Sequence, residues 1–276
     1  MLPRDALSVF RERFGTPRAL IGMLHVGALP GTPAACHSIE TLIQQALADA
    51  RIYRDAGFTG LAIENMHDRP YLKGGVGPEI TAAMTVIARE VKREMGLPLG
   101  IQVLAAANRE ALAIAHASGA DFVRVEGFVY AHVADEGVIE SCAGELLRCR
   151  RAIGAESVLV FADIKKKHSA HTITADVSIV ETAKAAEFFL ADGVVVTGAA
   201  TGEPASPEEV RDVAQASGVP VLVGSGITPV NLPQFSRAHG FIVGSSVKEG
   251  GVWHNRLDPA AVRAVVAAFA GLSPDP

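Results

Sequence analysis

Eight short apolar runs alternate with eight helix-like segments along the chain, and this alternation predicts a (β/α)8 barrel, or TIM barrel. The runs are rich in Val, Ile and Leu, as expected of parallel strands that helices cover. The chain has 276 residues, close to the roughly 250 of a typical barrel, and no linker divides it. An open doubly wound sheet is the main alternative, but its usual Gly-x-Gly-x-x-Gly after the first strand is absent. We therefore expect residues 1–276 to form one barrel domain.

The expected elements follow one another in order. Strands are expected over 19–25, 60–64, 97–104, 121–126, 157–165, 193–198, 219–223 and 240–243. Helices are expected over 38–57, 78–95, 108–119, 141–152 and 176–190, the third of them capped by Asn108, and three more begin at a cap residue followed by proline at 206, 228 and 258. A further short N-terminal helix over 5–14 places Phe10 and Phe14 on one side, and we expect it to cover the bottom of the barrel.

Composition excludes several classes of function. Hydrophobic residues make up 49% and aromatic residues only 5%, which favours packed strand–helix layers over a surface that stacks nucleic-acid bases. The net charge of −5 argues against a general polyanion binder. No apolar run approaches the roughly 20 residues that span a bilayer, and the mixed charges of the N-terminus are unlike a secretory signal. The three scattered cysteines form no disulfide pattern. We expect a cytoplasmic protein with no nucleic-acid partner and no membrane insertion; a homo-oligomer is left open.

Two apolar runs near the C-terminal end each stop at a glycine–serine pair. The run over 219–223 is followed by Gly224, Ser225 and Gly226, and the run over 240–243 by Gly244, Ser245 and Ser246. In a barrel, the loops after strands seven and eight commonly hold a phosphate group. Such a site needs free backbone N–H groups and little side-chain bulk, which these residues supply. We predict that they bind the phosphate of a ligand, and two tight turns without a ligand are the plainer alternative.

Polar residues stand at the ends of other strands, where a barrel carries its chemistry. Glu64 ends the second strand and is followed by Asn65 and Asp68. We expect Glu64 to be catalytic and the other two to bind substrate. A solvated loop would account for Asp68 but less well for Glu64, whose strand neighbours are core-like. Further candidates for substrate binding are His25, Gln102, Glu126 and Thr197.

The fifth strand carries the densest set of titratable residues. Asp163 and Lys165 share a face by alternation, and Lys166, Lys167 and His168 follow. A carboxylate, an amine and an imidazole at one strand end suit proton transfer at carbon, a Schiff base, or stabilisation of an enolate. We expect Asp163, Lys167 and His168 to be catalytic and Lys165 to bind substrate. A solvated loop charge is the plainer interpretation of Lys166 or Lys167, and we expect it to hold for one of them.

Other ionic residues of the strands allow two interpretations. Arg124 and Glu126 share one face of the fourth strand, where an ion pair between them and a functional role are equally good interpretations.

No metal motif is present, and the sequence requires no cofactor. The carboxylates of Glu64, Glu126 and Asp163 could nevertheless converge on Mg²⁺, which takes oxygen ligands.

Several motifs occur in a characteristic order. They are Leu29-Pro30-Gly31-x-Pro33, Glu64-Asn65-x-x-Asp68-x-Pro70, Val76-Gly77-Pro78-Glu79, Phe122-Val-Arg-Val-Glu126, Ala162-Asp163-Ile-Lys165-x-Lys167-His168, Val196-Thr197-Gly198-x-x-Thr201-Gly202, Val223-Gly224-Ser225-Gly226 and Ile242-Val243-Gly244-Ser245-Ser246-x-Lys248. Together they resemble the BtpA/SgcQ family over roughly residues 20–260. The resemblance implies a TIM barrel of the ribulose-phosphate-binding type. The family is named for a role in photosystem I biogenesis, and other members sit beside sugar-uptake genes.

Two departures from the family pattern fall in the loop after the second strand. Met66-His67 stands where a small residue and Gly are expected, and Tyr71 stands where Phe is usual. Both changes touch the loop that carries Asn65 and Asp68, so they bear on the identity of the substrate.

Three hypotheses of function follow. The first is an enzyme that acts on a phosphorylated small molecule, a sugar phosphate or a phosphoribosyl compound, by acid/base isomerase or lyase chemistry. The second is a non-catalytic biogenesis or assembly factor, as the family name suggests. The third is a barrel that binds a phosphorylated metabolite without turnover. The composition gives the assembly factor no positive support, since no coiled coil, charged tail or long apolar patch is visible.

Overall fold

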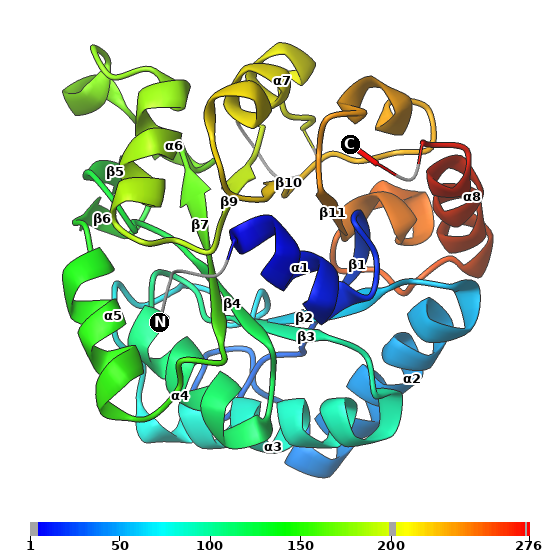
Figure 1. Cartoon of the computed structure of the whole chain (residues 1–276). Helices are drawn as coiled ribbons and strands as arrows, with labels where there is room; N and C mark the ends of the chain where they lie inside the picture. Colours follow the sequence, from blue (N-terminus) through cyan, green and yellow to red (C-terminus); the bar gives the residue numbers. More distant parts are fainter. Residues whose placement is uncertain (1–4, 199–202, 274) are drawn as a thin grey trace.

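The computed structural model describes residues 5–198, 203–273 and 275–276. Within them, eight parallel strands close a barrel in the order β1-β11-β10-β9-β7-β4-β3-β2 (Figure 1). The strands are β1 (Ala19–His25), β2 (Gly60–Glu64), β3 (Leu99–Gln102), β4 (Phe122–Val125), β7 (Leu159–Ile164), β9 (Gly193–Val196), β10 (Val221–Val223) and β11 (Gly240–Val243). The predicted barrel is confirmed, and all eight carboxyl ends lie at one mouth.

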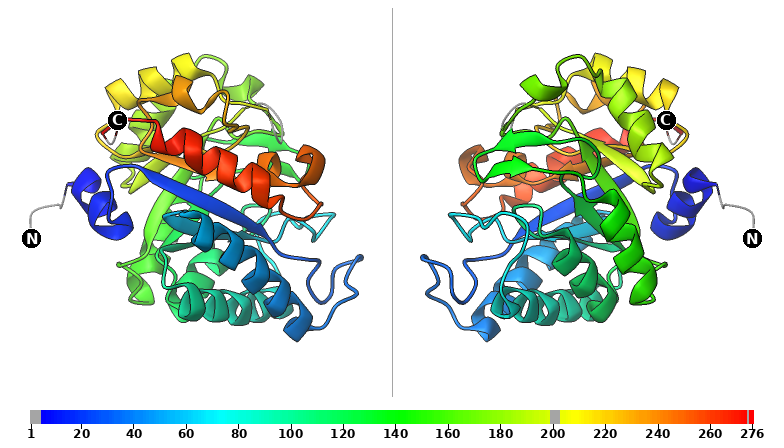
Figure 2. Two further views of the ribbon diagram at one scale, coloured as in Figure 1. Left: turned by 90° about the vertical axis from the view of Figure 1, so that its right-hand side faces the viewer. Right: turned by 90° about the vertical axis from the view of Figure 1, so that its left-hand side faces the viewer.

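Helices surround the barrel on the outside (Figures 1 and 2). They are α2 (Ile39–Ala56), α3 (Pro78–Met95), α4 (Asn108–Ser118), α5 (Ala143–Ala152), α6 (Ile179–Phe188), α7 (Pro207–Ala216) and α8 (Pro259–Ala270). Capping side chains start several of them: Ser38 accepts from the N–H of Thr41, and Ser206 from that of Glu209. The predicted starts after Ser206 and Asp258, each with proline at the first helical position, are confirmed.

The short helix α1 (Ala6–Phe14) covers the amino-terminal end of the barrel, as expected (Figure 1). Its Phe10 ring lies 6.1 Å from that of Phe161, and its Phe14 ring lies 5.8 Å from that of Phe122. A Cβ at Gly100 would lie 2.1 Å from the Phe122 ring, so the missing side chain makes room for it. Aromatic rings therefore fill the lower barrel, and the polar residues lie above them.

One predicted helix is wrong. After residue 228 the chain forms only a short 3₁₀-helix, η2 (Leu232–Phe235). The cap hydrogen bond itself forms, since Thr228 Oγ1 accepts from the N–H of Asn231 at 3.3 Å. Pro233 then lacks an N–H to donate, and β11 begins at Gly240, so no α-helix extends.

The predicted cap at Asn108 is also wrong. Ala107 stands at the cap position, and Asn108 is the first residue of α4. Its side chain instead donates to the backbone oxygen of Glu126 at 2.8 Å, which ties α4 to the end of β4.

A small antiparallel sheet at the barrel mouth was not predicted. The strands β5 (His132–Ala134), β6 (Gly137–Ile139) and β8 (Ser169–Ala170) form it in the order β6-β5-β8. It joins the loop after β4 to the loop after β7 and lies over that side of the mouth. None of the helices in the described part of the chain is both long and apolar enough to span a bilayer.

Candidate functional site

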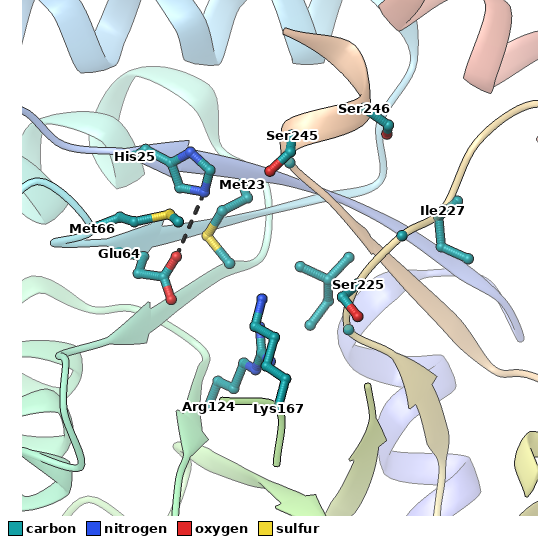
Figure 3. A pocket seen from close by; sticks show the side chains of 14 residues that line it. Met23, His25, Glu64, Met66, Arg124, Lys167, Ser225, Ile227, Ser245 and Ser246 are labelled. Atoms are coloured by element: carbon teal, nitrogen blue, oxygen red, sulfur yellow. Dashed lines mark ion pairs between the residues drawn. The ribbon is translucent and has the colours of Figure 1, made fainter. Parts of the chain in front are cut away.

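A pocket of about 450 Å³ lies at the carboxyl ends of the strands (Figure 3). All six residues of the predicted phosphate loops line it: Gly224, Ser225, Gly226, Gly244, Ser245 and Ser246. The remaining walls include His25, Glu64, Arg124 and Lys167. The structure therefore brings the two glycine–serine loops together with His25, Glu64 and Lys167, whereas Asp163 and His168 line an adjoining hollow.

A close backbone approach requires glycine at position 226. A Cβ at Gly226, where φ is +67°, would lie 2.3 Å from the backbone nitrogen of Pro204. The Ser225 hydroxyl accepts from the N–H of Gly198 at 2.9 Å and donates to the oxygen of Glu203 at 3.1 Å. The Ser225 hydroxyl is therefore engaged in hydrogen bonds within the loops, and only the backbone of Ser225 is available to bind a ligand. Ser245 begins a short 3₁₀-helix, η3 (Ser245–Val247), with its side chain directed toward the pocket (Figure 3).

Two cationic side chains face these loops. Arg124, buried on β4, donates from Nε to Asp163 Oδ1 at 2.9 Å. Its Nη2 lies 3.1 Å from the position that a Cβ of Gly224 would take, so the guanidinium reaches the loop after β10. The side chain of Lys167 projects into the middle of the pocket (Figure 3). The backbone N–H of Lys167 donates to Thr197 Oγ1 at 3.1 Å. Burial, followed by the charge of Arg124, lowers the pKa of the Lys167 amine.

Glu64 and His25 form a pair at the opposite wall, with Glu64 Oε2 3.5 Å from His25 Nε2. Burial lowers the pKa of His25 to about 3 and raises that of Glu64. His25 Nδ1 lies 3.3 Å from the oxygen of Trp253, which requires a proton on Nδ1 for a hydrogen bond and leaves Nε2 as an acceptor. The geometry would also allow an ion pair, but the pKa of His25 favours a neutral imidazole, and the raised pKa of Glu64 shifts its carboxyl toward the protonated form.

A second, larger hollow of about 820 Å³ adjoins the pocket and shares Glu64, Met66 and Lys167 with it. Glu126 lies at its base, where it accepts from Gln102 Nε2 at 3.3 Å and from the N–H of Ala106 at 2.9 Å. Lys166 Nζ is 3.3 Å from Glu126 Oε1. Tyr71 and Trp253 form part of the wall of this hollow, and His168, which is exposed, is also part of its lining.

The carboxylates of Glu64, Glu126 and Asp163 do not converge on one point. Glu64 faces His25, Asp163 faces Arg124, and Glu126 faces Lys166. No group of three or more His, Cys, Asp or Glu side chains arranged to hold a metal ion occurs in the described ranges. The residues present therefore do not fit the Mg²⁺ site that the sequence allowed, because a cation or an imidazole stands beside each carboxylate.

A model of the BtpA family matches residues 16–271. The chain belongs to the BtpA family. It is 51% identical over 260 residues to a mitochondrial protein of Caenorhabditis elegans, with 92% of this chain and 94% of that protein covered. It is 35% identical over 268 residues to the photosystem I biogenesis protein BtpA of Synechocystis, with 96% and 93% covered.

Solved barrels are similar to this BtpA-family chain in fold. One is (S)-3-O-geranylgeranylglyceryl phosphate synthase from Thermoplasma acidophilum in complex with sn-glycerol-1-phosphate, with a TM-score of 0.62, 16% identity and coverage of 97% and 98%. Another is orotidine 5'-monophosphate decarboxylase from Methanocaldococcus jannaschii, with a TM-score of 0.58, 12% identity and coverage of 92% and 98%. At these identities the similarity concerns the fold alone.

In this BtpA-family barrel, Asn65 and Asp68 hold loops together. Asn65 Oδ1 accepts from the N–H of Leu104 at 2.7 Å, and its Nδ2 donates to Asp68 Oδ2 at 2.9 Å. Asp68 Oδ1 accepts from the N–H of Leu29 at 2.8 Å. Both residues line a hollow beside Gly31 rather than the two at the barrel mouth. The structure thus places them outside the pocket that holds Glu64.

Lys165 also lies apart from the main pocket. β7 ends at Ile164, and Lys165 has a φ of +48°, so the strand alternation that would place it beside Asp163 stops before it. Its ammonium donates to the oxygen of Thr174 at 2.8 Å, under the small sheet. Thr201 and Gly202, part of a family motif, lie outside the described residues.

The ionic partners differ from those expected. Arg124 pairs with Asp163 and not with Glu126, which pairs with Lys166. The prediction of one solvated charge among Lys166 and Lys167 is wrong, since Lys166 is buried and Lys167 is half-buried in the pocket. Arg124–Asp163 joins β4 to β7, and Glu126–Lys166 joins the loops that follow these strands, so alternation along one strand could not identify either pair.

Sequence reasoning missed Trp253, which follows β11. Arg69 lies over its indole at 4.9 Å, and the His67 ring is 4.8 Å from it. Tyr71 donates its hydroxyl to the oxygen of Met66 at 2.7 Å. The residues that depart from the family pattern therefore contact one another or Trp253. The only signal for Trp253 was that it is the single tryptophan of the chain.

Proposed function

We propose that this chain is an enzyme that binds a phosphorylated small molecule, a sugar phosphate or a phosphoribosyl compound, and moves protons on it. One observation carries the proposal: two glycine–serine loops share a pocket with Arg124, Lys167 and a protonatable carboxyl, that of Glu64. Backbone N–H groups and nearby cations are the partners that a phosphate group requires. A carboxyl across the pocket then has access to the carbon skeleton that the phosphate anchors.

The acid/base groups support isomerase or lyase chemistry. Burial raises the pKa of Glu64, which shifts this carboxyl toward the protonated form that can donate a proton. Asp163 is held by Arg124 on the neighbouring strand, and its Oδ2 is buried without a hydrogen-bond partner among the described residues. A matched acid and base at one substrate carbon would move a proton between adjacent carbons, or help to break a bond beside a carbonyl.

The solved barrels of similar fold agree with this assignment at the level of fold. One holds sn-glycerol-1-phosphate, and others are a phosphoribosyl anthranilate isomerase and orotidine 5'-monophosphate decarboxylase. A shared barrel supports a phosphate-binding mouth by analogy, while the reaction depends on the residues present.

Binding of phosphate esters tests the proposal. We expect ribose 5-phosphate and other phosphosugars to raise the Tm in a thermal-shift screen, because a ligand that binds only the folded state stabilises it. Ser245→Glu should weaken binding by at least about tenfold, because its carboxylate would repel the phosphate. Ser236→Glu, at an exposed serine outside the pocket, is the control. A folded sample that no phosphate ester stabilises would refute the proposal.

A biogenesis factor is the second candidate, favoured by the name of the Synechocystis relative. The nematode relative weakens it, because an animal has no photosystem to assemble. Complementation in a strain that lacks its own family member separates the two. An enzyme should fail with Glu64→Gln, whereas an assembly factor should tolerate this substitution.

A further inference from the structure

Lys167 differs from the two lysines that precede it. Lys165 donates to the backbone oxygen of Thr174, and Lys166 pairs with Glu126. In the described part of the chain, no side chain or backbone oxygen forms a hydrogen bond or ion pair with the ammonium of Lys167. Lys167 nevertheless lines both hollows at the barrel mouth, and Figure 3 shows its nitrogen directed into the space between Glu64 and Ser225.

The surroundings of Lys167 do not suit a permanently charged side chain. The side chain is half-buried, and the guanidinium of Arg124 lies in the same pocket. Burial and this like charge both lower the pKa of the amine, which increases the fraction of neutral nucleophile. Arg124 Nη2 already lies close to the loop after β10, so the phosphate end has a cation without Lys167.

We infer that Lys167 is a nucleophile that forms a Schiff base with the carbonyl carbon of a phosphorylated aldehyde or ketone. The inference rests on the proposed function, because the phosphate held by the glycine–serine loops brings the carbonyl to the amine. It narrows the substrate class to phosphate esters that carry, or open to, a free carbonyl group.

The step balances with groups already in the pocket. The neutral amine of Lys167 attacks the carbonyl carbon, and the π electron pair moves to the oxygen. A proton passes from the attacking nitrogen to that oxygen, which gives a neutral carbinolamine. Glu64, whose pKa burial raises, donates the proton with which the hydroxyl leaves as water. The product is a protonated imine, and no metal or redox partner is needed. The imine then acts as an electron sink for loss of a proton or a carbon fragment from the adjacent carbon.

Reductive trapping tests the inference directly. The folded wild-type protein is incubated with dihydroxyacetone phosphate or ribose 5-phosphate and sodium borohydride, then digested and mapped by mass spectrometry. Hydride addition converts the imine to a stable secondary amine, so the modified peptide gains the mass of the ester less one oxygen atom. We expect the adduct at Lys167 to exceed that at Lys165 or Lys166 by at least about tenfold, because only Lys167 has an aligned carbonyl.

Three controls define the outcome. Excess inorganic phosphate, and dihydroxyacetone in place of its phosphate ester, should each reduce the adduct at Lys167 by about tenfold, because both remove the phosphate anchor. Lys167→Arg keeps the charge but cannot form the imine, so it should lose the adduct while phosphate esters still raise its Tm. Should this variant not fold, the site-resolved result on the wild-type protein stands alone.

The possible failures can be distinguished. Stabilisation by phosphate esters without an adduct at Lys167 would overturn the inference and leave the proposed function standing, with Lys167 as a phosphate ligand. Equal labelling of all three lysines, or equal labelling by dihydroxyacetone, would also overturn it. Absence of both the adduct and the stabilisation would refute the proposed function as well.

Discussion

The buried carboxylates of Glu64, Glu126 and Asp163 each face a basic side chain from a different strand or loop. Glu64 on β2 faces His25 on β1, and Asp163 on β7 faces Arg124 on β4. Removing such groups from water costs several kcal/mol per ion, which only good pairing offsets. Burial of these groups around a pocket is typical of sites that carry out chemistry.

The pKa of Glu64 gives a stability prediction with a definite sign. Burial raises this pKa above its ordinary value of 4.5, so the folded state keeps a proton that the unfolded chain loses. The free energy of unfolding therefore falls as the pH rises above about 4.5. The Glu64→Gln side chain cannot ionise, so the Tm of this variant should exceed that of the wild type at about pH 8. The expected difference is about 2–4 °C for each kcal/mol gained in the free energy of unfolding. The gain should vanish toward about pH 4. A Tm difference that does not change with pH would contradict the raised pKa.

The Arg124–Asp163 pair predicts a strong coupling. Arg124→Met or Asp163→Asn alone should each lower the free energy of unfolding by about 3–5 kcal/mol, because either one leaves a buried charge unpaired. The double variant should lose less than the sum, by at least about 1 kcal/mol, in urea unfolding.

Arg211→Met breaks the exposed Arg211–Asp212 pair and serves as the control, with an expected change within about 0.5 kcal/mol. Additive losses for Arg124→Met and Asp163→Asn would mean that the two side chains are not coupled.

For single residues, the sequence could identify candidate site residues but not the groups with which their side chains interact. Glu64, Gln102 and Asp163 stand out as polar residues in apolar runs, and the structure places all three at the mouth. Asn65 and Asp68 gave the same kind of signal, yet their side chains bond to loop backbone and to each other. A polar residue after a strand can either form hydrogen bonds that hold loops together or contribute to a catalytic site. Only the packing of the loops in the structure distinguishes these two roles.

Among the elements, α1 has a structural role, because it closes the end of the barrel opposite the candidate site. Its two phenylalanines pack on rings that point into the barrel from β4 and β7. The helix could be predicted from its one-sided apolar pattern, and its caps agree with that pattern: Asp5 accepts from the N–H of Ser8, and Gly15 ends it with φ of +67°.

Truncation of Phe14 tests this role. Phe14→Ala should lower the free energy of unfolding by about 3–5 kcal/mol, because it removes a buried ring and leaves a cavity. Phosphate-ester affinity should not change, because the site lies at the other end of the barrel. Phe188→Ala, at a ring that is 81% exposed, is the matched control and should change stability by less than about 0.5 kcal/mol. Equal losses in Phe14→Ala and Phe188→Ala would show that α1 does not plug the barrel.

Elements were predictable where local signals agreed with the tertiary structure. Ser206 with Pro207 starts α7 as expected, whereas Thr228 with Pro229 completes only a turn. The difference lies downstream, since Pro233 and the early return of β11 leave no room for helix propagation. The small sheet was missed because β5 and β6 have only three residues each, too few for a visible alternation.

At the scale of the whole molecule, the barrel determines where the loops meet. β10 and β11 are neighbours in the closed sheet, so the glycine–serine loops that follow them share one wall of the pocket. Their order along the chain was enough to predict this placement. The second hollow could not be predicted, because it combines loops that follow β2, β3, β4, β7 and β11.

The central claim is that these two loops bind the phosphate of the substrate. A crystal structure with ribose 5-phosphate tests it most directly. We predict a phosphate group within hydrogen-bond distance of the backbone nitrogens of Gly226 and Ser245, with the sugar extending toward Lys167 and Glu64. A phosphate group bound at another part of the surface, with the pocket between the loops filled only by water, would contradict it.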